Sequence, residues 1–120
     1  MTPFGAKLRE LRASRHVTLK RMAADLQLSS AYLSALEHGK RGRPSPVLLI
    51  QICQYFHLIW ENAEELERLA QLSHPRVTVD TSGLEAEATE LANVLAERIH
   101  DLEPQLVRRL LALIRGAAKE

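Results

Sequence analysis

Residues 17–41, VTLKRMAADLQLSSAYLSALEHGKR, contain two short helical patterns joined by a very short connection. Thr18 and Ser29 stand at the two starts, and threonine and serine are preferred helix N-caps. Behind each cap, apolar residues recur at three- and four-residue intervals, as on one face of a helix. These residues are Leu19, Met22, Ala23 and Leu26 in the first pattern and Leu33 and Leu36 in the second. With Gly39 as a C-terminal glycine cap, the stretch predicts helices over 18–26 and 29–38.

Only two residues separate these predicted helices, which leaves room for nothing but a sharp turn. Two short helices joined in this way are the helix-turn-helix signature. In such a motif the first helix lies across the DNA backbone and the second enters the major groove. The spacing therefore predicts a double-stranded DNA-binding element.

The same stretch resembles the Cro/repressor (XRE) family of bacterial and phage DNA-binding domains, and the likeness covers about residues 4–58. The matching positions are Thr18, Ala23, Leu26, Ser29, Tyr32, Leu33, Ser34, Leu36, Glu37 and Gly39. Leu19 stands where members usually have a glutamine that braces a phosphate contact, so we expect that contact to be lost. Gln27 stands where members favour glycine in a left-handed conformation, which costs about 1 kcal/mol for a residue with a Cβ.

The resemblance also implies which side chains meet DNA. It places Ser30, Ala31, Ser34 and Ala35 toward the groove. The strong base readers, arginine on guanine and glutamine or asparagine on adenine, are absent there, so direct readout should be modest. The alternative is that these small residues serve close packing on DNA or on a protein. The expected DNA-binding residues are Thr18, Lys20, Arg21, Ser29, Ser30, Ala31, Tyr32, Ser34, Ala35, His38, Lys40, Arg41 and Arg43.

The segment that follows, EHGKRGRPSP at residues 37–46, contains Lys-Arg-Gly-Arg-Pro at 40–44 and resembles the AT-hook peptide. Three roles are open for it. It could be a plain surface turn, or Arg41 and Arg43 could contact phosphates. Alternatively Arg43, held extended by Pro44, enters the narrow minor groove of an A/T-rich segment and adds specificity.

Apolar periodicity and helix start signals, among them Thr2-Pro3 and Ser45-Pro46, predict further helices over about 3–15, 46–56, 60–73, 84–102 and 104–116. Between them the segment SHPRVTVDTSG, residues 73–83, breaks the helical pattern. It predicts a linker, and the alternation of Val77 and Val79 allows a short strand. Ser82 and Glu85 have the spacing of a capping box, which would begin the next helix.

We therefore expect an all-α protein with a five-helix repressor-like DNA-binding domain followed by a C-terminal helical dimerisation hairpin. The expected boundaries are residues 1–73 for the helix-turn-helix domain, 74–83 for the linker and 84–120 for the dimerisation segment. The last segment carries an apolar stripe that would leave a large exposed patch on a lone hairpin. Its residues are Leu84, Ala88, Leu91, Leu95, Ile99 and Leu102.

The charge distribution favours nucleic acid as the partner of the first part of the chain. The formal net charge is +1, but residues 1–45 carry nine lysines and arginines against three acidic residues. Residues 46–120 carry seven against twelve. A basic front half joined to an acidic back half indicates that only the front meets a polyanion.

The predicted function is a dimeric, sequence-specific transcriptional regulator. A repressor fits better than an activator, because lambdoid repressors activate through an acidic patch on the second helix and this chain has Lys20 and Arg21 there. One alternative is the antitoxin of a toxin-antitoxin pair, whose acidic tail would hold a basic protein partner. The other is a protein-interaction module without DNA binding, against which the basic front half argues.

Other residue types predict no further chemistry. The single cysteine, Cys53, cannot form an internal disulfide or a thiolate metal site, which suits a reducing cytoplasm. The expected localisation is therefore cytoplasmic, in association with the nucleoid. On its apolar stripe Cys53 is expected to be a small core side chain rather than a redox sensor. The five histidines are scattered, so we expect no metal, and no pattern indicates a cofactor or catalysis. No stretch reads as a membrane span or a signal peptide.

Overall fold

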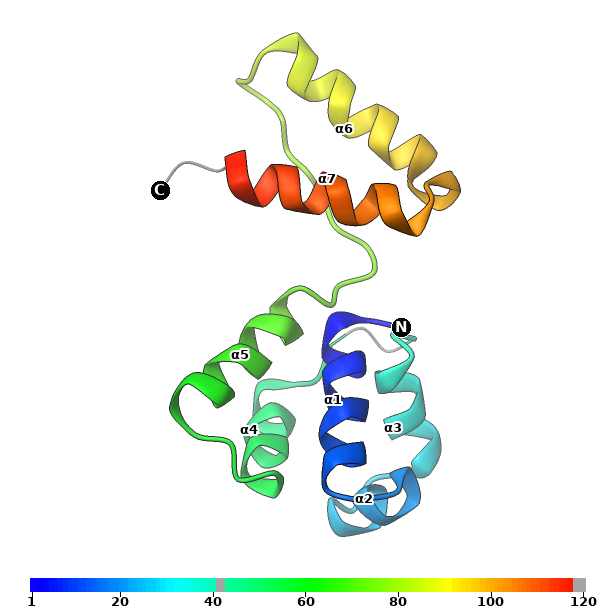
Figure 1. Ribbon diagram of the computed structural model, residues 1–120, viewed down its shortest axis with the longest axis vertical. Coiled ribbons are helices and arrows are strands. Elements are labelled where there is room, and N and C mark those ends of the chain that lie inside the picture. Colours follow the sequence, from blue (N-terminus) through cyan, green and yellow to red (C-terminus); the bar gives the residue numbers. More distant parts are fainter. Residues whose placement is uncertain (41–42, 118–120) are drawn as a thin grey trace. The chain divides into compact units, whose positions relative to one another are not determined.

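The computed structural model describes residues 1–40 and 43–117, and every regular element in these ranges is helical (Figure 1). The chain divides into two compact units, Met1–Val77 and the segment from Thr78 onward. The all-α prediction is thus confirmed. None of the described helices is both long and apolar enough to cross a lipid bilayer.

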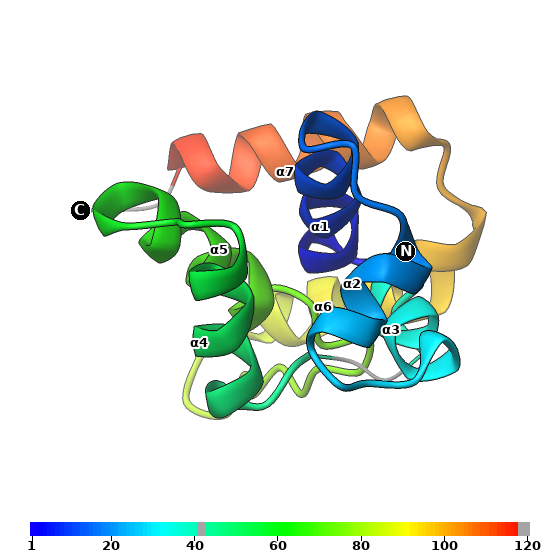
Figure 2. The same ribbon diagram turned by 90° about the horizontal axis from the view of Figure 1, so that it is seen from below.

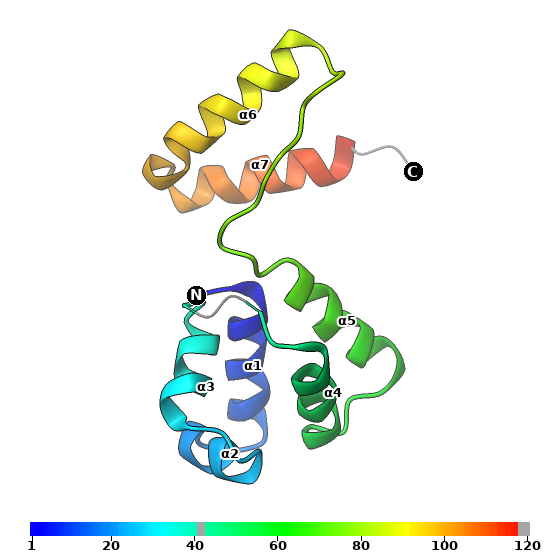
Figure 3. The ribbon, with the colours of Figure 1, turned by 180° about the vertical axis from the view of Figure 1, so that it is seen from behind.

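The first unit contains five helices. They are α1 (Pro3–Ser14), α2 (Leu19–Asp25), α3 (Ser30–Glu37), α4 (Pro46–Tyr55) and α5 (Trp60–Gln71). Helix α1 lies in the middle, with α3 on one side and α4 and α5 on the other (Figures 1 and 3). Each of the first four helices has a hydroxyl N-cap that accepts a backbone N–H bond, as expected from the sequence. The caps are Thr2, Thr18, Ser29 and Ser45.

One apolar core joins the five helices. Its buried members are Phe4, Leu8, Met22, Ala23, Leu33, Leu36, Leu48, Ile52, Phe56, Leu66 and Ala70. They come from all five helices and include Met22, Ala23, Leu33 and Leu36 from the predicted apolar faces, whereas Leu19 and Leu26 are only half-buried. Leu49 and Cys53 are half-buried beside this core and not inside it. The expectation of a core cysteine therefore holds only in part.

Helix α3 is held against α1 by a close backbone contact and a buried ion pair. A Cβ on Gly5 would lie 1.9 Å from the carbonyl oxygen of Glu37, so only glycine allows this approach. The Glu37 side chain is 2% exposed, and Arg12 donates to its two carboxylate oxygens at 2.7 and 3.0 Å. The pair and the glycine together fix the orientation of α3.

The connection between α2 and α3 is the sharp turn that the spacing predicts (Figure 2). Gln27 has φ 59°, the left-handed conformation expected at this position. The N–H of Leu28 donates to the carbonyl of Ala23 at 2.8 Å, which closes the end of α2. At the other end of α3, Gly39 has φ 81°, as a glycine C-cap requires.

The second unit contains α6 (Ala86–Arg98), the 3-10 helix η1 (Ile99–Asp101) and α7 (Pro104–Ala117). Helices α6 and α7 diverge from the corner at η1 (Figures 1 and 3). No residue between Thr78 and Ala117 is buried. The exposed large apolar side chains of this unit are Val79, Leu84, Leu91, Val94, Leu95, Ile99, Leu106, Val107, Leu111, Leu113 and Ile114.

Two local predictions for the linker are wrong. Ser82 does not cap α6, because Asp80 accepts both its hydroxyl at 2.6 Å and its N–H at 2.9 Å. Gly83 then takes φ 84°, and α6 begins later, with Glu85 at the N-cap position and no side-chain cap bond. The short strand suggested by Val77 and Val79 is also not formed, since residues 77–81 have no regular structure.

Candidate nucleic-acid interface

The outward face of α3 carries only small side chains. Leu33, Leu36 and Glu37 are buried, which turns the opposite face of the helix away from the core. On that face Ser30 and Ala31 are exposed and Ser34 and Ala35 are half-buried. Ser29 accepts the N–H of Tyr32 at 3.0 Å and fixes the start of the helix. The outward face of α3 therefore has no long side chains, and its polar side-chain atoms are the serine hydroxyls.

The start of α2 presents two exposed cations, Lys20 and Arg21. Thr18 accepts the N–H of Arg21 at 3.1 Å as the N-cap. Arg21 Nε also lies 3.1 Å from Asp25, which the sequence reasoning did not anticipate. The hydroxyl of Tyr55 donates to Asp25 at 2.7 Å, and this bond, with help from Arg21, lowers the pKa of that carboxyl. Asp25 therefore stays ionised at neutral pH and partly offsets the charge of Arg21.

Two hydrogen bonds close the C-terminal end of α3, where the loop begins. The His38 ring nitrogen Nδ1 donates to the carbonyl of Ser34 at 2.8 Å, and the N–H of Lys40 donates to the carbonyl of Ala35 at 2.9 Å. Lys40 and Arg43 are exposed, whereas Pro44 is buried. Arg41, another predicted DNA-binding residue, lies outside the described residues.

Three of the predicted residues meet at one basic groove of about 810 Å³. Tyr32 from α3 and Lys40 and Arg43 from the loop line it. His74 and Arg76, which lie a few residues after the end of α5, line the same groove and were missed by the sequence analysis. Helix α4 also begins at this groove, and the positive end of its dipole favours anions there. Two segments far apart in the chain thus add cations to one surface beside α3.

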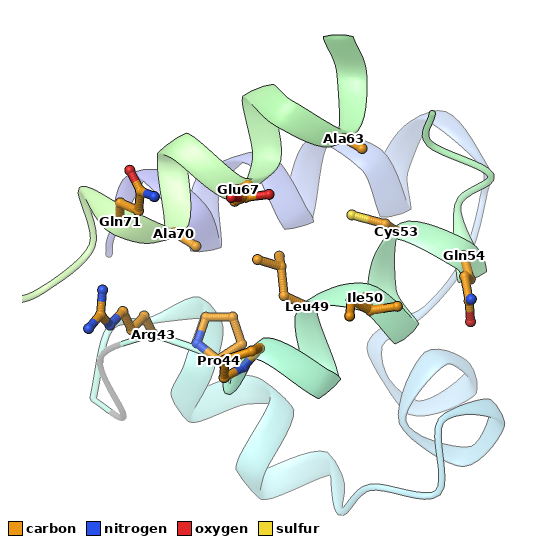
Figure 4. Close-up of a pocket in the computed structure, with 11 residues that line it drawn as sticks. Arg43, Pro44, Leu49, Ile50, Cys53, Gln54, Ala63, Glu67, Ala70 and Gln71 are labelled. Carbon is orange, nitrogen blue, oxygen red and sulfur yellow. The ribbon is translucent and has the colours of Figure 1, made fainter. Parts of the chain in front are cut away.

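A second hollow, of about 550 Å³, lies between α4 and α5 (Figure 4). Leu49, Ile50 and Cys53 form an apolar wall, and Arg43 stands at one end (Figure 4). Burial raises the pKa of the Cys53 thiol, and the nearby charge of Glu67 raises it further. Because the thiolate is the reactive form, this environment disfavours redox sensing by Cys53.

Comparison with known proteins agrees with this geometry. The family described as "Helix-turn-helix domain" matches residues 3–69. The uncharacterized HTH-type transcriptional regulator RghRB of Bacillus subtilis (strain 168) is 40% identical over 62 residues, which are 52% of this chain and 45% of that protein. The chain thus aligns with less than half of RghRB.

The HTH-type transcriptional repressor RghR of the same organism is 31% identical over 98 residues, covering 78% of this chain and 73% of the relative. No solved structure matches the chain significantly. The family match spans all five helices of the first unit except the end of α5, and the second relative extends beyond it. The chain belongs to the helix-turn-helix family of DNA-binding proteins.

Proposed function

We propose that this protein is a transcriptional repressor that binds a two-half-site DNA operator as a homodimer. The observation that carries the proposal is the exposed face of small side chains on α3, with exposed cations on the helix before it and in the loop after it. Lys20 and Arg21 lie at the start of α2, and Lys40 and Arg43 follow α3. The relative RghR, named a transcriptional repressor, supports the direction of regulation.

In this proposal α3 enters the major groove. Ser30 and Ser34 offer hydroxyls that serve several bases, and Ala31 and Ala35 can touch a thymine methyl. Thr18 and Ser29 accept backbone N–H bonds, yet each hydroxyl keeps a proton to donate to a phosphate oxygen. Tyr32, His38 and the surrounding cations add phosphate contacts, which position the helix without reading sequence.

Two alternative roles are open for Arg43 in this proposal. It either contacts phosphate or reads the minor groove of an A/T-rich segment beside the half-site. Replacing Arg43 by alanine distinguishes them on operators whose flanking A/T pairs are kept or changed to G/C. An equal loss of affinity on both DNAs means a phosphate contact, whereas a loss confined to the A/T operator means minor-groove reading.

The second unit supplies the dimer contact in this proposal. Its apolar stripes are exposed and need a cover, because patches of this extent are rare on monomers. Helix α6 carries Glu87, Glu90 and Glu97 against the single cation Arg98, whereas the charged residues of α7 between Pro104 and Ala117 are arginines. An acidic helix and a basic helix suit a second copy of the same chain, in which α6 packs on α7 of the partner. Two copies would place two α3 helices on half-sites about 34 Å apart.

The salt dependence of DNA binding tests this function. If a dimer makes roughly 6 to 10 phosphate contacts, affinity for duplex DNA falls by about a thousandfold or more between 50 and 200 mM salt. A double variant with Lys40→Gln and Arg43→Gln should show a clearly shallower slope, because it lacks two cations per copy. A nearly flat salt dependence of the wild-type protein contradicts DNA binding.

A further inference from the structure

We propose that residues 74–76 are a second DNA-contacting segment, in which Arg76 and His74 hold a backbone phosphate in the basic groove beside α3. This inference rests on the proposed function and adds a contact that lies outside the helix-turn-helix motif. It assigns the DNA backbone as the ligand of the groove.

The lining of the groove defines its chemistry. Lys40 and Arg43 come from the loop between α3 and α4, and His74 and Arg76 come from the chain after α5. The remaining described residues that line it are Tyr32, Pro44, Ser45, Pro46 and Pro75, so none of them is acidic. All four basic side chains are exposed. A groove lined by three permanent cations and, among the described residues, by no carboxylate suits a polyanion.

The start of the segment is fixed by the fold. Ser73 is 2% exposed, accepts the N–H of Phe4 at 2.9 Å and donates its hydroxyl to the carbonyl of Leu69 at 2.6 Å. These bonds tie the end of α5 to the start of α1, and Pro75 restricts the backbone of the next residues. Because the segment is held at its start, less conformational entropy is lost when Arg76 engages a phosphate.

The position of the groove favours DNA over a free anion. Tyr32 belongs to α3 and lines the groove, so a phosphate held there lies next to the helix that the motif inserts into the major groove. The volume of about 810 Å³ exceeds what one isolated anion fills and accommodates a stretch of sugar-phosphate backbone. We therefore assign the groove to the phosphates that flank each half-site.

The test compares Arg76→Gln with Arg68→Gln in the full chain. Arg68 lies on α5, does not line the groove and donates to Gln71 at 3.2 Å, so its replacement removes the same charge elsewhere. The probe is a DNA duplex of about 30 base pairs, titrated over a series of salt concentrations. Arg76→Gln should weaken binding by about tenfold at low salt and lower the slope of log K against log salt by about 1 per engaged site. Arg68→Gln should resemble the wild type, and both variants should melt like it.

Three outcomes overturn the inference in different ways. If Arg76→Gln and Arg68→Gln bind alike while the wild type keeps its steep slope, the segment does not contact DNA and the proposed function stands. If the wild type shows no salt-dependent binding, both proposals fail. If a polyglutamate peptide binds the wild type but not Arg76→Gln, and DNA affinity is unchanged, the groove serves an acidic protein partner instead.

Discussion

The two units of this chain use similar apolar helices in opposite ways. In the first unit, Phe4, Leu8 and Leu33 are fully buried against one another and their neighbours. In the second, Leu91 is 66% exposed and Leu113 is also 66% exposed, although each lies on a comparable apolar face. Periodicity thus identifies which face of a helix is apolar, but not whether the same chain covers it. The uncovered faces of α6 and α7 are the reason for placing the dimer contact there.

The largest effect that separates the two units is expected from adding a methyl group to a glycine. Gly5→Ala places a Cβ 1.9 Å from a backbone oxygen of Glu37, which forces α1 and α3 apart. We expect a loss of more than about 4 kcal/mol in the free energy of unfolding, measured by urea denaturation. Gly116→Ala in α7 is the matched control, because nothing lies within 4 Å of its added Cβ. A similar small change in both variants would contradict the close α1–α3 contact.

A smaller effect is expected from the ion pair that orients α3. Glu37→Gln leaves the half-buried Arg12 guanidinium without its carboxylate, which should cost about 3 kcal/mol of stability. Glu10→Gln removes an exposed carboxylate 3.4 Å from Lys7 and should change stability by less than about 1 kcal/mol. Equal losses in the two variants, measured by chemical denaturation, would mean that the Arg12–Glu37 pair is no more important than a surface pair.

The smallest effect concerns Asp25 beside α2. Tyr55→Phe removes the hydrogen bond that lowers the pKa of Asp25, so this pKa should rise toward its ordinary value. Because the folded-state pKa is depressed, the bond stabilises the fold above the ordinary carboxyl pKa, and the contribution is lost as pH falls through the folded value. Wild type and variant should therefore differ near neutral pH and converge in acid.

An NMR titration of the Asp25 carboxyl in the two proteins checks this shift. Asp80 in the second unit serves as the internal reference, since its lowered pKa comes from Ser82 and not from Tyr55. An unchanged Asp25 pKa in Tyr55→Phe would show that another group sets it.

Local signals in the sequence were sufficient where a residue acts on its own helix. The N-caps Thr18, Ser29 and Ser45 were predicted correctly, because each accepts the N–H of the residue three positions further along the chain. The left-handed conformation of Gln27 was also predicted correctly, but that prediction came from the family resemblance. The Ser82 capping box failed within the same range, since Asp80 competes for the serine hydroxyl. The capping-box pattern does not take such a competitor into account.

Tertiary signals were not available from the sequence. The Arg12–Glu37 pair joins residues 25 positions apart, and nothing in their local pattern identifies them as partners. The basic groove joins Lys40 to Arg76, and the chain before Arg76 is held by the bond between Phe4 and Ser73, which are 69 positions apart. The DNA-binding positions on α2, α3 and the loop come from the family resemblance, and their contacts with DNA stay predictions.

Sedimentation of the full chain and of residues 1–77, each with and without operator DNA, tests the central claim most directly. The account predicts that the full chain is a dimer and that residues 1–77 form a folded monomer with much weaker operator binding, because only the first unit has its own core. A full-length double variant with Leu91→Lys and Leu95→Lys should behave like the truncated chain. A fragment of residues 1–77 that still sediments as a dimer, or a full chain that sediments as a monomer, would contradict the account.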